Sequence, residues 1–236
     1  EVLSDPARRS VLRVAVATEI EGLLRGSVAG GDIQFQLARI FAGLAITSEQ
    51  IEFVRSILAG GLEGLVIDRD LHWYLTISLA ERGEITRTEI DDVLTKDPTL
   101  TGELSHTQAL AALPDPITKA ETWKSLINDE LSTSKRAVLL SGFMVARQSE
   151  ILAAYVDPYF EALLQMWSNS SFDVASSSVE ALYPRYVIAQ ETLDKTDTWL
   201  SGTGAGAPEV LRRLVSEGRD SLARALRIQQ RDALGA

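Results

Sequence analysis

The chain has 236 residues, 23 basic and 33 acidic side chains, and a formal net charge of −10. This length suits one large domain or two small ones. The acidic balance argues against nucleic acid as the main partner, because phosphate binding needs a basic surface. No run approaches the ~18 apolar residues of a membrane span, so we expect no membrane partner. The chain has no cysteine, which excludes disulfides and cysteine zinc sites.

Helix signals recur along the whole chain, beginning at Pro6, and Gly30 and Gly31 form the first break. Three further starts carry a capping residue, two of them with the capping-box partner three positions later: Thr47 with Gln50, Asp68, and Thr86 with Glu89. Later helices are predicted to begin near Thr101, Pro114, Ser132, Gln148, Ser171, Pro184 and Pro208. Pro158 lies inside a predicted helix over 151–167 and should kink or restart it.

Signals for strands are nearly absent, because the apolar residues recur every three or four positions rather than every two. We therefore predict an all-α fold of about eleven or twelve helices. Short helices joined by tight breaks must pack on their neighbours, which favours an α-α superhelix, a solenoid of HEAT or armadillo type. A compact helical bundle is the alternative. We expect residues 1–236 to form a single domain.

Residues that could carry catalysis are sparse. His72 and His106 are the two histidines, and neither lies in a His-Glu-x-x-His motif. The acidic pair Asp68 and Asp70 sits at a predicted helix start, where capping is the expected role. The segment 202–206 (Gly-Thr-Gly-Ala-Gly) superficially resembles a phosphate loop but follows a helix, so we predict a flexible linker. We expect no catalytic residue and no metal ligand in this chain.

The last predicted helix carries a stripe of arginines. Arg213, Arg224 and Arg231 lie within about 20° of one another around the helix, with Arg227 about 40° away. Leucines and a valine occupy the other side. One interpretation is a solvated face with salt bridges to Glu217 and Asp220. The other is a grip for the carboxylate of a peptide or for an acidic surface, because guanidinium binds carboxylates in bidentate fashion.

Several short stretches resemble the C-terminal helical domain of the zinc aminopeptidase N family of high-GC bacteria, also called the endoplasmic-reticulum-aminopeptidase-like C-terminal domain. They run in order over nearly the whole chain, at 64–73, 97–102, 119–123, 141–148, 155–160, 211–220 and 223–226. The resemblance implies a longer peptidase in which a thermolysin-like domain holds zinc through His-Glu-x-x-His and a distant glutamate. This sequence contains neither that motif nor the family's Gly-x-Met-Glu-Asn strand.

By this resemblance the chain is the C-terminal part of an aminopeptidase that removes N-terminal residues from peptides. It would close the active-site chamber and limit substrate access, with the catalytic domain of the same polypeptide and the peptide substrate as its partners. Zinc would belong to the parent, which we expect to be cytoplasmic, and the isolated chain would be inactive. Basic residues on the inner face of such domains can hold a peptide's C-terminus, which agrees with a substrate-binding role for Arg213, Arg224, Arg227 and Arg231. The alternative is a free-standing α-solenoid that scaffolds protein partners.

Overall fold

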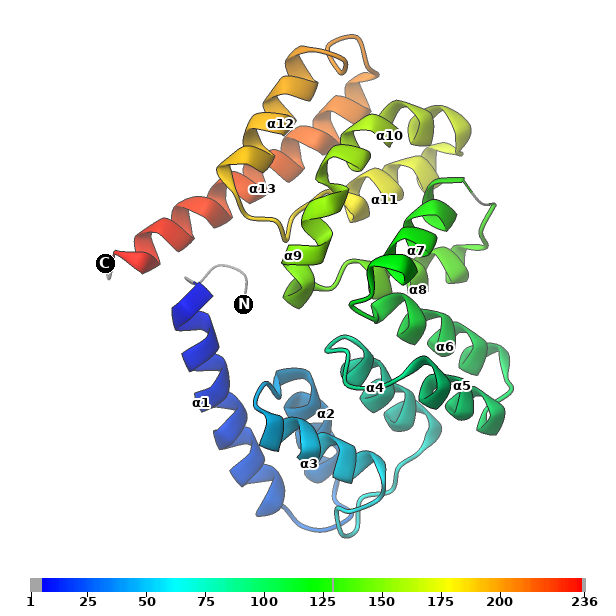
Figure 1. The fold of residues 1–236 in the computed structure, drawn as a ribbon, viewed down its shortest axis with the longest axis vertical. Coiled ribbons are helices and arrows are strands. Elements are labelled where there is room, and N and C mark those ends of the chain that lie inside the picture. The colour runs from blue at the N-terminus through cyan, green and yellow to red at the C-terminus, as the bar shows by residue number, and fades with distance from the viewer. Residues whose placement is uncertain (1–5, 129, 235–236) are drawn as a thin grey trace. The chain divides into compact units, whose positions relative to one another are not determined.

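The structure is a computed structural model that describes residues 6–128 and 130–234, and those residues contain helices but no strand. Thirteen α-helices are assigned there, and twelve of them have at least ten residues, against the eleven or twelve predicted. The all-α prediction is confirmed (Figure 1). No single helix of the described residues is long and apolar enough to cross a membrane, although the stretches 133–143 and 146–169 meet that test when counted together.

The described residues divide into two compact units, which we describe separately. The N-terminal unit comprises Pro6–Lys119 and Ser132–Gly142, and the C-terminal unit comprises Ala120–Leu131 and the residues from Phe143 onward. The N-terminal unit holds α1 (Pro6–Arg25), α2 (Asp32–Leu44), α3 (Ser48–Leu58), α4 (Arg69–Ala80), α5 (Arg87–Lys96) and α6 (Leu100–Ala112). The C-terminal unit holds α9 (Ser149–Leu152), α10 (Val156–Asn169), α11 (Phe172–Leu182), α12 (Gln190–Ser201) and α13 (Glu209–Ala233). Helices α7 (Pro116–Asn128) and α8 (Thr133–Phe143) contribute residues to both units.

The predicted caps form as expected. Thr47 accepts a hydrogen bond from the backbone N–H of Gln50, whose side chain accepts one from the backbone of Thr47. Thr86 and Glu89 make the same reciprocal pair at the start of α5. Asp68 Oδ1 accepts from the backbone N–H of Leu71, 2.8 Å away. Each cap satisfies a donor that the first helical turn leaves without an intrahelical partner.

Proline behaves as predicted at one position and not at another. Pro158 lies in the first turn of α10, after a break formed by a short 3₁₀ segment at Ala153–Tyr155, because a proline is tolerated where the N–H has no helical partner. The helix start predicted near Pro184 is wrong: residues 184–189 contain a turn and a bend, and the helix, α12, begins at Gln190. Tyr186, Val187 and Ile188 follow the proline, and aromatic and β-branched side chains are poor helix formers.

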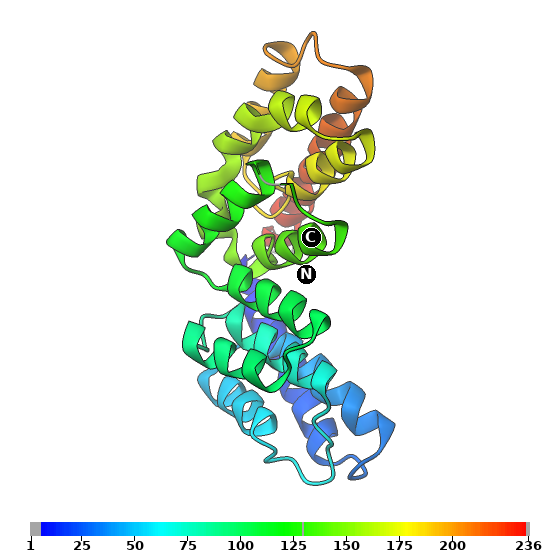
Figure 2. The ribbon, with the colours of Figure 1, turned by 90° about the vertical axis from the view of Figure 1, so that its right-hand side faces the viewer.

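In the N-terminal unit, α1 packs on α2 and α4 packs on α6, and both pairs lie side by side in two views (Figures 1 and 2). Two arginines donate hydrogen bonds to carbonyl oxygens at the C-terminal end of α2. Arg82 donates to the carbonyl oxygens of Ala42 and Ala45, at 2.7 and 3.0 Å, and Arg13 donates to that of Gly43. Cations are favoured at a helix C-terminus, where carbonyl oxygens lack partners.

Glycine is required at the turns of the N-terminal unit. Gly30, Gly60, Gly64 and Gly83 have φ between 73° and 83°, in the left-handed region that other residues rarely adopt. Gly30 and Gly64 stand in the connections before α2 and α4, and Gly60 and Gly83 follow the last residues of α3 and α4 by two and three positions. These four are the positive-φ residues of the part of the chain that the structure describes.

The C-terminal unit is built around buried tyrosines. Tyr159 of α10 is fully buried and donates a hydrogen bond from Oη to the carbonyl oxygen of Val179 on α11, 2.9 Å away. Tyr183 packs edge-on against Tyr159, and its hydroxyl pairs with Thr196 of α12 at 3.0 Å. Burial raises the pKa of Tyr183 to about 12, and that of Tyr159 lies well above its ordinary value for the same reason. Both hydroxyls therefore stay neutral and hydrogen-bonded.

Candidate functional site

The arginine stripe lies on the exposed side of α13. Arg213, Arg224, Arg227 and Arg231 are all exposed, whereas the opposite side of the helix is buried, with Leu211 and Val215 fully so. This side packs on α11 and α12. The sequence therefore predicted correctly that α13 is amphipathic and that the arginines share one face, and the structure shows that this face is exposed in the described chain.

The stripe divides into a paired half and an unpaired half. Arg213 Nε lies 3.6 Å from Glu217, which confirms one of the two salt bridges considered, while Asp220 is approached by Arg219 at 3.7 Å. Arg224, Arg227 and Arg231 have no carboxylate partner among residues 6–128 and 130–234. Their spacing of three and four residues spreads three guanidinium groups over about 10 Å of helix. The structure thus narrows the candidate anion-binding surface to these three residues.

The two histidines are not assembled into a metal site. His106 on α6 pairs with Asp91 on α5, with 2.6 Å between Nε2 and Oδ1. His72 on α4 is half-buried, and burial followed by the positive charge of Lys96 lowers its pKa. Within the described residues no group of three His, Cys, Asp or Glu side chains could hold a metal ion. The described residues therefore do not fit a zinc site.

The glycine-rich segment 202–206 connects α12 to α13 as a loop of hydrogen-bonded turns. The backbone N–H of Gly204 donates to the carbonyl oxygen of Trp199 at 2.7 Å, and two further turn hydrogen bonds follow. A Cβ at Gly204 would overlap the indole ring of Trp199. The glycine is needed because the loop packs directly against this tryptophan, which is 5% exposed.

A pocket in the N-terminal unit was not predicted. It has a volume of about 380 Å³ and lies among α2, α4 and α6, with Arg39, Asp70, Tyr74, Ser105 and Gln108 among its lining residues. Arg39 is stacked on Tyr74, with 4.6 Å from the guanidinium carbon to the ring centroid. Sequence reasoning noted Asp70 only as part of an acidic pair at a helix start. No local pattern links Arg39 to Tyr74, because they become neighbours only when α2 packs on α4.

The paired helices, joined by short connections, define an all-α domain of the helical-repeat class. The chain belongs to the family of ERAP1-like C-terminal domains, whose family model matches residues 4–224. This confirms the resemblance and the predicted fold class, since that domain is an α-helical superhelix. Arg227 and Arg231 lie beyond the matched residues.

Among curated relatives, the Aminopeptidase N of Streptomyces lividans is 40% identical to this chain over 216 residues. The match covers 90% of this chain and 25% of that protein, so the chain spans about a quarter of the length of the relative. Both comparisons identify this chain as similar to one domain of an aminopeptidase.

Proposed function

We propose that the chain is the C-terminal domain of a zinc aminopeptidase, where it closes the active-site chamber and limits which peptides enter. The observation that carries the proposal is the 40% identity to an Aminopeptidase N over 90% of this chain, together with the family match over residues 4–224. In this proposal zinc and the catalytic groups belong to the rest of the parent polypeptide. A cytoplasmic location is an expectation of the same resemblance.

The test compares the parent enzyme with a form that lacks these 236 residues. Activity on a single-residue aminoacyl reporter and on a long peptide gives the ratio of kcat/KM for the two substrates, and zinc content by elemental analysis controls for an intact catalytic domain. We expect the shortened enzyme to retain zinc and to lose its discrimination against large substrates. An unchanged ratio would contradict the chamber-closing role. A start codon immediately before Glu1 would instead favour the free-standing scaffold.

Exposed apolar stripes support contact with the rest of the polypeptide. On α2, Ile33, Leu37, Ile40 and Leu44 follow one another at spacings of four, three and four residues, which places them on one face. Ile33 is 70% exposed and Ile40 is 46% exposed. Helix α1 also carries an exposed apolar face, with Leu12, Val16 and Leu23 exposed while Ala17 and Leu24 are buried against the unit. Exposed apolar stripes of this kind mark interaction surfaces.

We infer that these stripes contact the preceding domains of the parent. The experiment mixes the 236-residue chain with the separately produced remainder of the parent and measures their affinity. Ile33→Lys with Ile40→Lys should weaken the complex at least about tenfold, because burying a lysine without a partner is costly. Val28→Lys is the matched control, since Val28 is 82% exposed and stands outside both helices. Equal affinities of the double variant and the control would argue against this surface.

The unpaired half of the arginine stripe is a candidate contact for the peptide carboxylate. In the parent, Arg224→Ala or Arg231→Ala should raise KM for a free-acid peptide by about ten- to a hundredfold, since a charged hydrogen bond contributes about 1.5–3 kcal/mol. The C-terminal amide of the same peptide should be unaffected. Arg213→Ala is the matched control, because Arg213 is already paired with Glu217. Equal behaviour of acid and amide in wild type and variants would eliminate the grip.

A further inference from the structure

The pocket among α2, α4 and α6 gathers polar groups that lack protein partners. Among the described residues, Arg39 makes no ion pair, and the Asp70 carboxylate, the Tyr74 hydroxyl and the Ser105 hydroxyl make no hydrogen bond. Other polar lining groups are satisfied: Gln108, for example, donates to Ser141 at 3.1 Å. Charged and polar groups without protein partners, converging in one concavity beside apolar side chains, can orient a polar ligand.

Arg39 is held in a geometry that suits a carboxylate. Its guanidinium lies over the ring of Tyr74, which fixes the plane of the group while leaving its N–H donors free at the edge. The side chain is half-buried, so an ion pair formed here is screened less than one at the open surface. Gly43 keeps room for the Tyr74 hydroxyl, because a Cβ at that position would lie 3.3 Å from Oη.

The same pocket carries the opposite charge. Asp70 stands in the first turn of α4 and is exposed, and its carboxylate has no basic partner in the described chain. Glu81, eleven residues later, also lines the pocket, but it interacts with other groups, including an electrostatic interaction with Lys119. Trp73 and Ile77 contribute apolar surface between these two ends. A simple anion would pair with Arg39 and leave Asp70 without a partner. A ligand that carries both a negative and a positive charge can pair with both residues.

We propose that this pocket binds a small zwitterion with an apolar side chain, either a free α-amino acid or a dipeptide. Arg39 binds the carboxylate, Asp70 binds the ammonium group, and the side chain lies against Trp73 and Ile77. The volume of about 380 Å³ suits a ligand of this size. The site is separate from the arginine stripe of α13 and goes beyond the proposed peptidase role. Its test requires no catalytic activity, so its failure is distinguishable from failure of that role.

The experiment is isothermal titration calorimetry of the 236-residue chain with leucine and with leucyl-leucine. N-acetyl-leucine lacks the ammonium group and leucinamide lacks the carboxylate, and each should bind at least about tenfold more weakly than the better zwitterion. The comparison of leucine with leucyl-leucine identifies which zwitterion the pocket takes. Trp73 lines the site, so its fluorescence gives a second readout.

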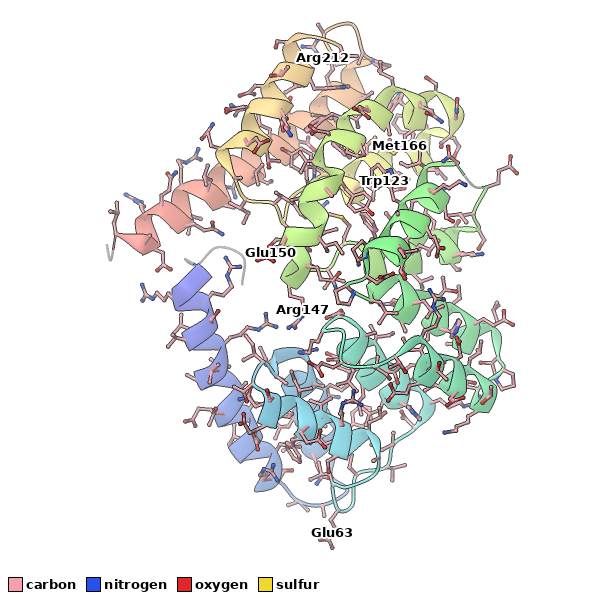
Figure 3. The ribbon with its side chains drawn as sticks, viewed as in Figure 1. Glu63, Trp123, Arg147, Glu150, Met166 and Arg212 are labelled. Atoms are coloured by element: carbon pink, nitrogen blue, oxygen red, sulfur yellow. The ribbon has the colours of Figure 1, made fainter. Side chains whose placement is uncertain are left out.

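Arg39→Gln should weaken the binding of the better zwitterion about ten- to a hundredfold, and Arg39→Lys should restore it only in part because lysine lacks the bidentate fork. Asp70→Asn should remove the preference for leucine over N-acetyl-leucine. The matched control is Arg212→Gln at the beginning of α13 (Figure 3), because Arg212 is an exposed arginine that, like Arg39, has no ion pair in the described chain. Absence of binding by both zwitterions, or equal affinities in Arg39→Gln and Arg212→Gln, would overturn the proposal. Circular dichroism verifies folding, and if Arg39→Gln does not fold, Arg39→Lys compared with Arg212→Gln tests the carboxylate contact in its place.

Discussion

Lys119 is fully buried, and its Nζ donates to the carbonyl oxygen of Gly142 at 2.9 Å, so that α7 is tied to the end of α8. A second hydrogen bond, also 2.9 Å, reaches the carbonyl oxygen of Ala111 near the end of α6. One lysine therefore serves carbonyl groups at two helix C-termini, where positive charge is favoured. Burial nevertheless lowers the pKa of Lys119 to about 7, while the charge of Glu81 acts in the opposite direction.

The first prediction concerns Lys119→Met. The ordinary pKa of lysine is 10.5, so between pH 7 and 10.5 the unfolded chain binds more protons at this position than the folded chain. The free energy of unfolding of the wild type should therefore rise relative to that of the variant as pH increases through this window, by at most about 1.4 kcal/mol per pH unit. Urea titrations at several pH values measure the difference. A difference that does not change with pH would mean that the pKa is unshifted.

The second prediction compares two glycines in helices. A Cβ at Gly142 would lie 2.5 Å from the carbonyl oxygen of Gln108 and 2.8 Å from Cβ of Ala111, so Gly142→Ala should cost about 1–3 kcal/mol of stability through overpacking. Gly22, on α1, has nothing within 4 Å of such an atom. Gly22→Ala should stabilise the chain by about 0.5–1 kcal/mol, since alanine is the better helix former. Chemical denaturation measures both, and effects of the same sign would contradict the described contact of α6 with α8.

The third prediction concerns the buried tyrosines of the C-terminal unit. Tyr159→Phe removes the hydrogen bond to the Val179 carbonyl oxygen and should lower the free energy of unfolding by about 1–2 kcal/mol. Tyr183→Phe should cost less, because Thr196 keeps its own 2.8 Å hydrogen bond to the carbonyl oxygen of Thr192. Equilibrium unfolding of the two variants under the same conditions tests the order. A larger loss of stability for Tyr183→Phe than for Tyr159→Phe would contradict this order.

The fourth prediction concerns acid stability. Asp97 accepts hydrogen bonds from Trp73 Nε1 at 3.0 Å and from Thr99, and Arg69 lies 3.4 Å away. The hydrogen bond from Trp73, first among these contacts, lowers the pKa of Asp97 below its ordinary value of 3.8. The stabilising contribution of the carboxylate is thus present above about pH 4 and is lost as pH falls through the lowered pKa. Asp97→Asn should be less stable than the wild type near neutral pH, and the two should converge in acid. A gap that persists unchanged into acid would show that the carboxylate charge is not responsible.

Local signals predicted helix starts well and helix packing poorly. Asp68 and Thr86 cap their helices through contacts within three residues, so the sequence alone is sufficient to identify them. Pro184 has the same local appearance as Pro208, which does precede a helix, but β-branched and aromatic residues follow it and the chain forms turns instead. The start of this helix is therefore set by the low helix propensity of the several residues that follow the proline, and not by the proline itself.

The candidate sites show the same division. The periodicity of α13 was sufficient to place Arg224, Arg227 and Arg231 on one side of the helix, because helical spacing fixes their relative angles. The exposure of that side is known only from the structure. The pairing of Arg213 with Glu217 is also an i, i+4 relationship within one helix. By contrast, the pocket of Arg39 and Asp70 depends on the packing of three helices, and neither residue has a distinctive neighbour in sequence. A site that forms only through tertiary packing leaves no local spacing pattern in a single sequence.

The left-handed glycines imply unequal tolerance of mutation along the chain. All four described positions with positive φ fall between Gly30 and Gly83, so a side chain at any of them strains the backbone even where space is free, as it is at Gly60. The glycines of the α12–α13 connection are restricted differently: Gly204 is restricted by the Trp199 ring, while Gly206 has open space around it. We therefore expect any replacement of the four positive-φ glycines to destabilise the chain, whatever the size of the new side chain. At Gly204, a smaller aromatic residue in place of Trp199 should make room for a side chain and restore the stability of a Gly204 variant. No such second substitution can compensate at Gly60, because the strain there lies in the backbone.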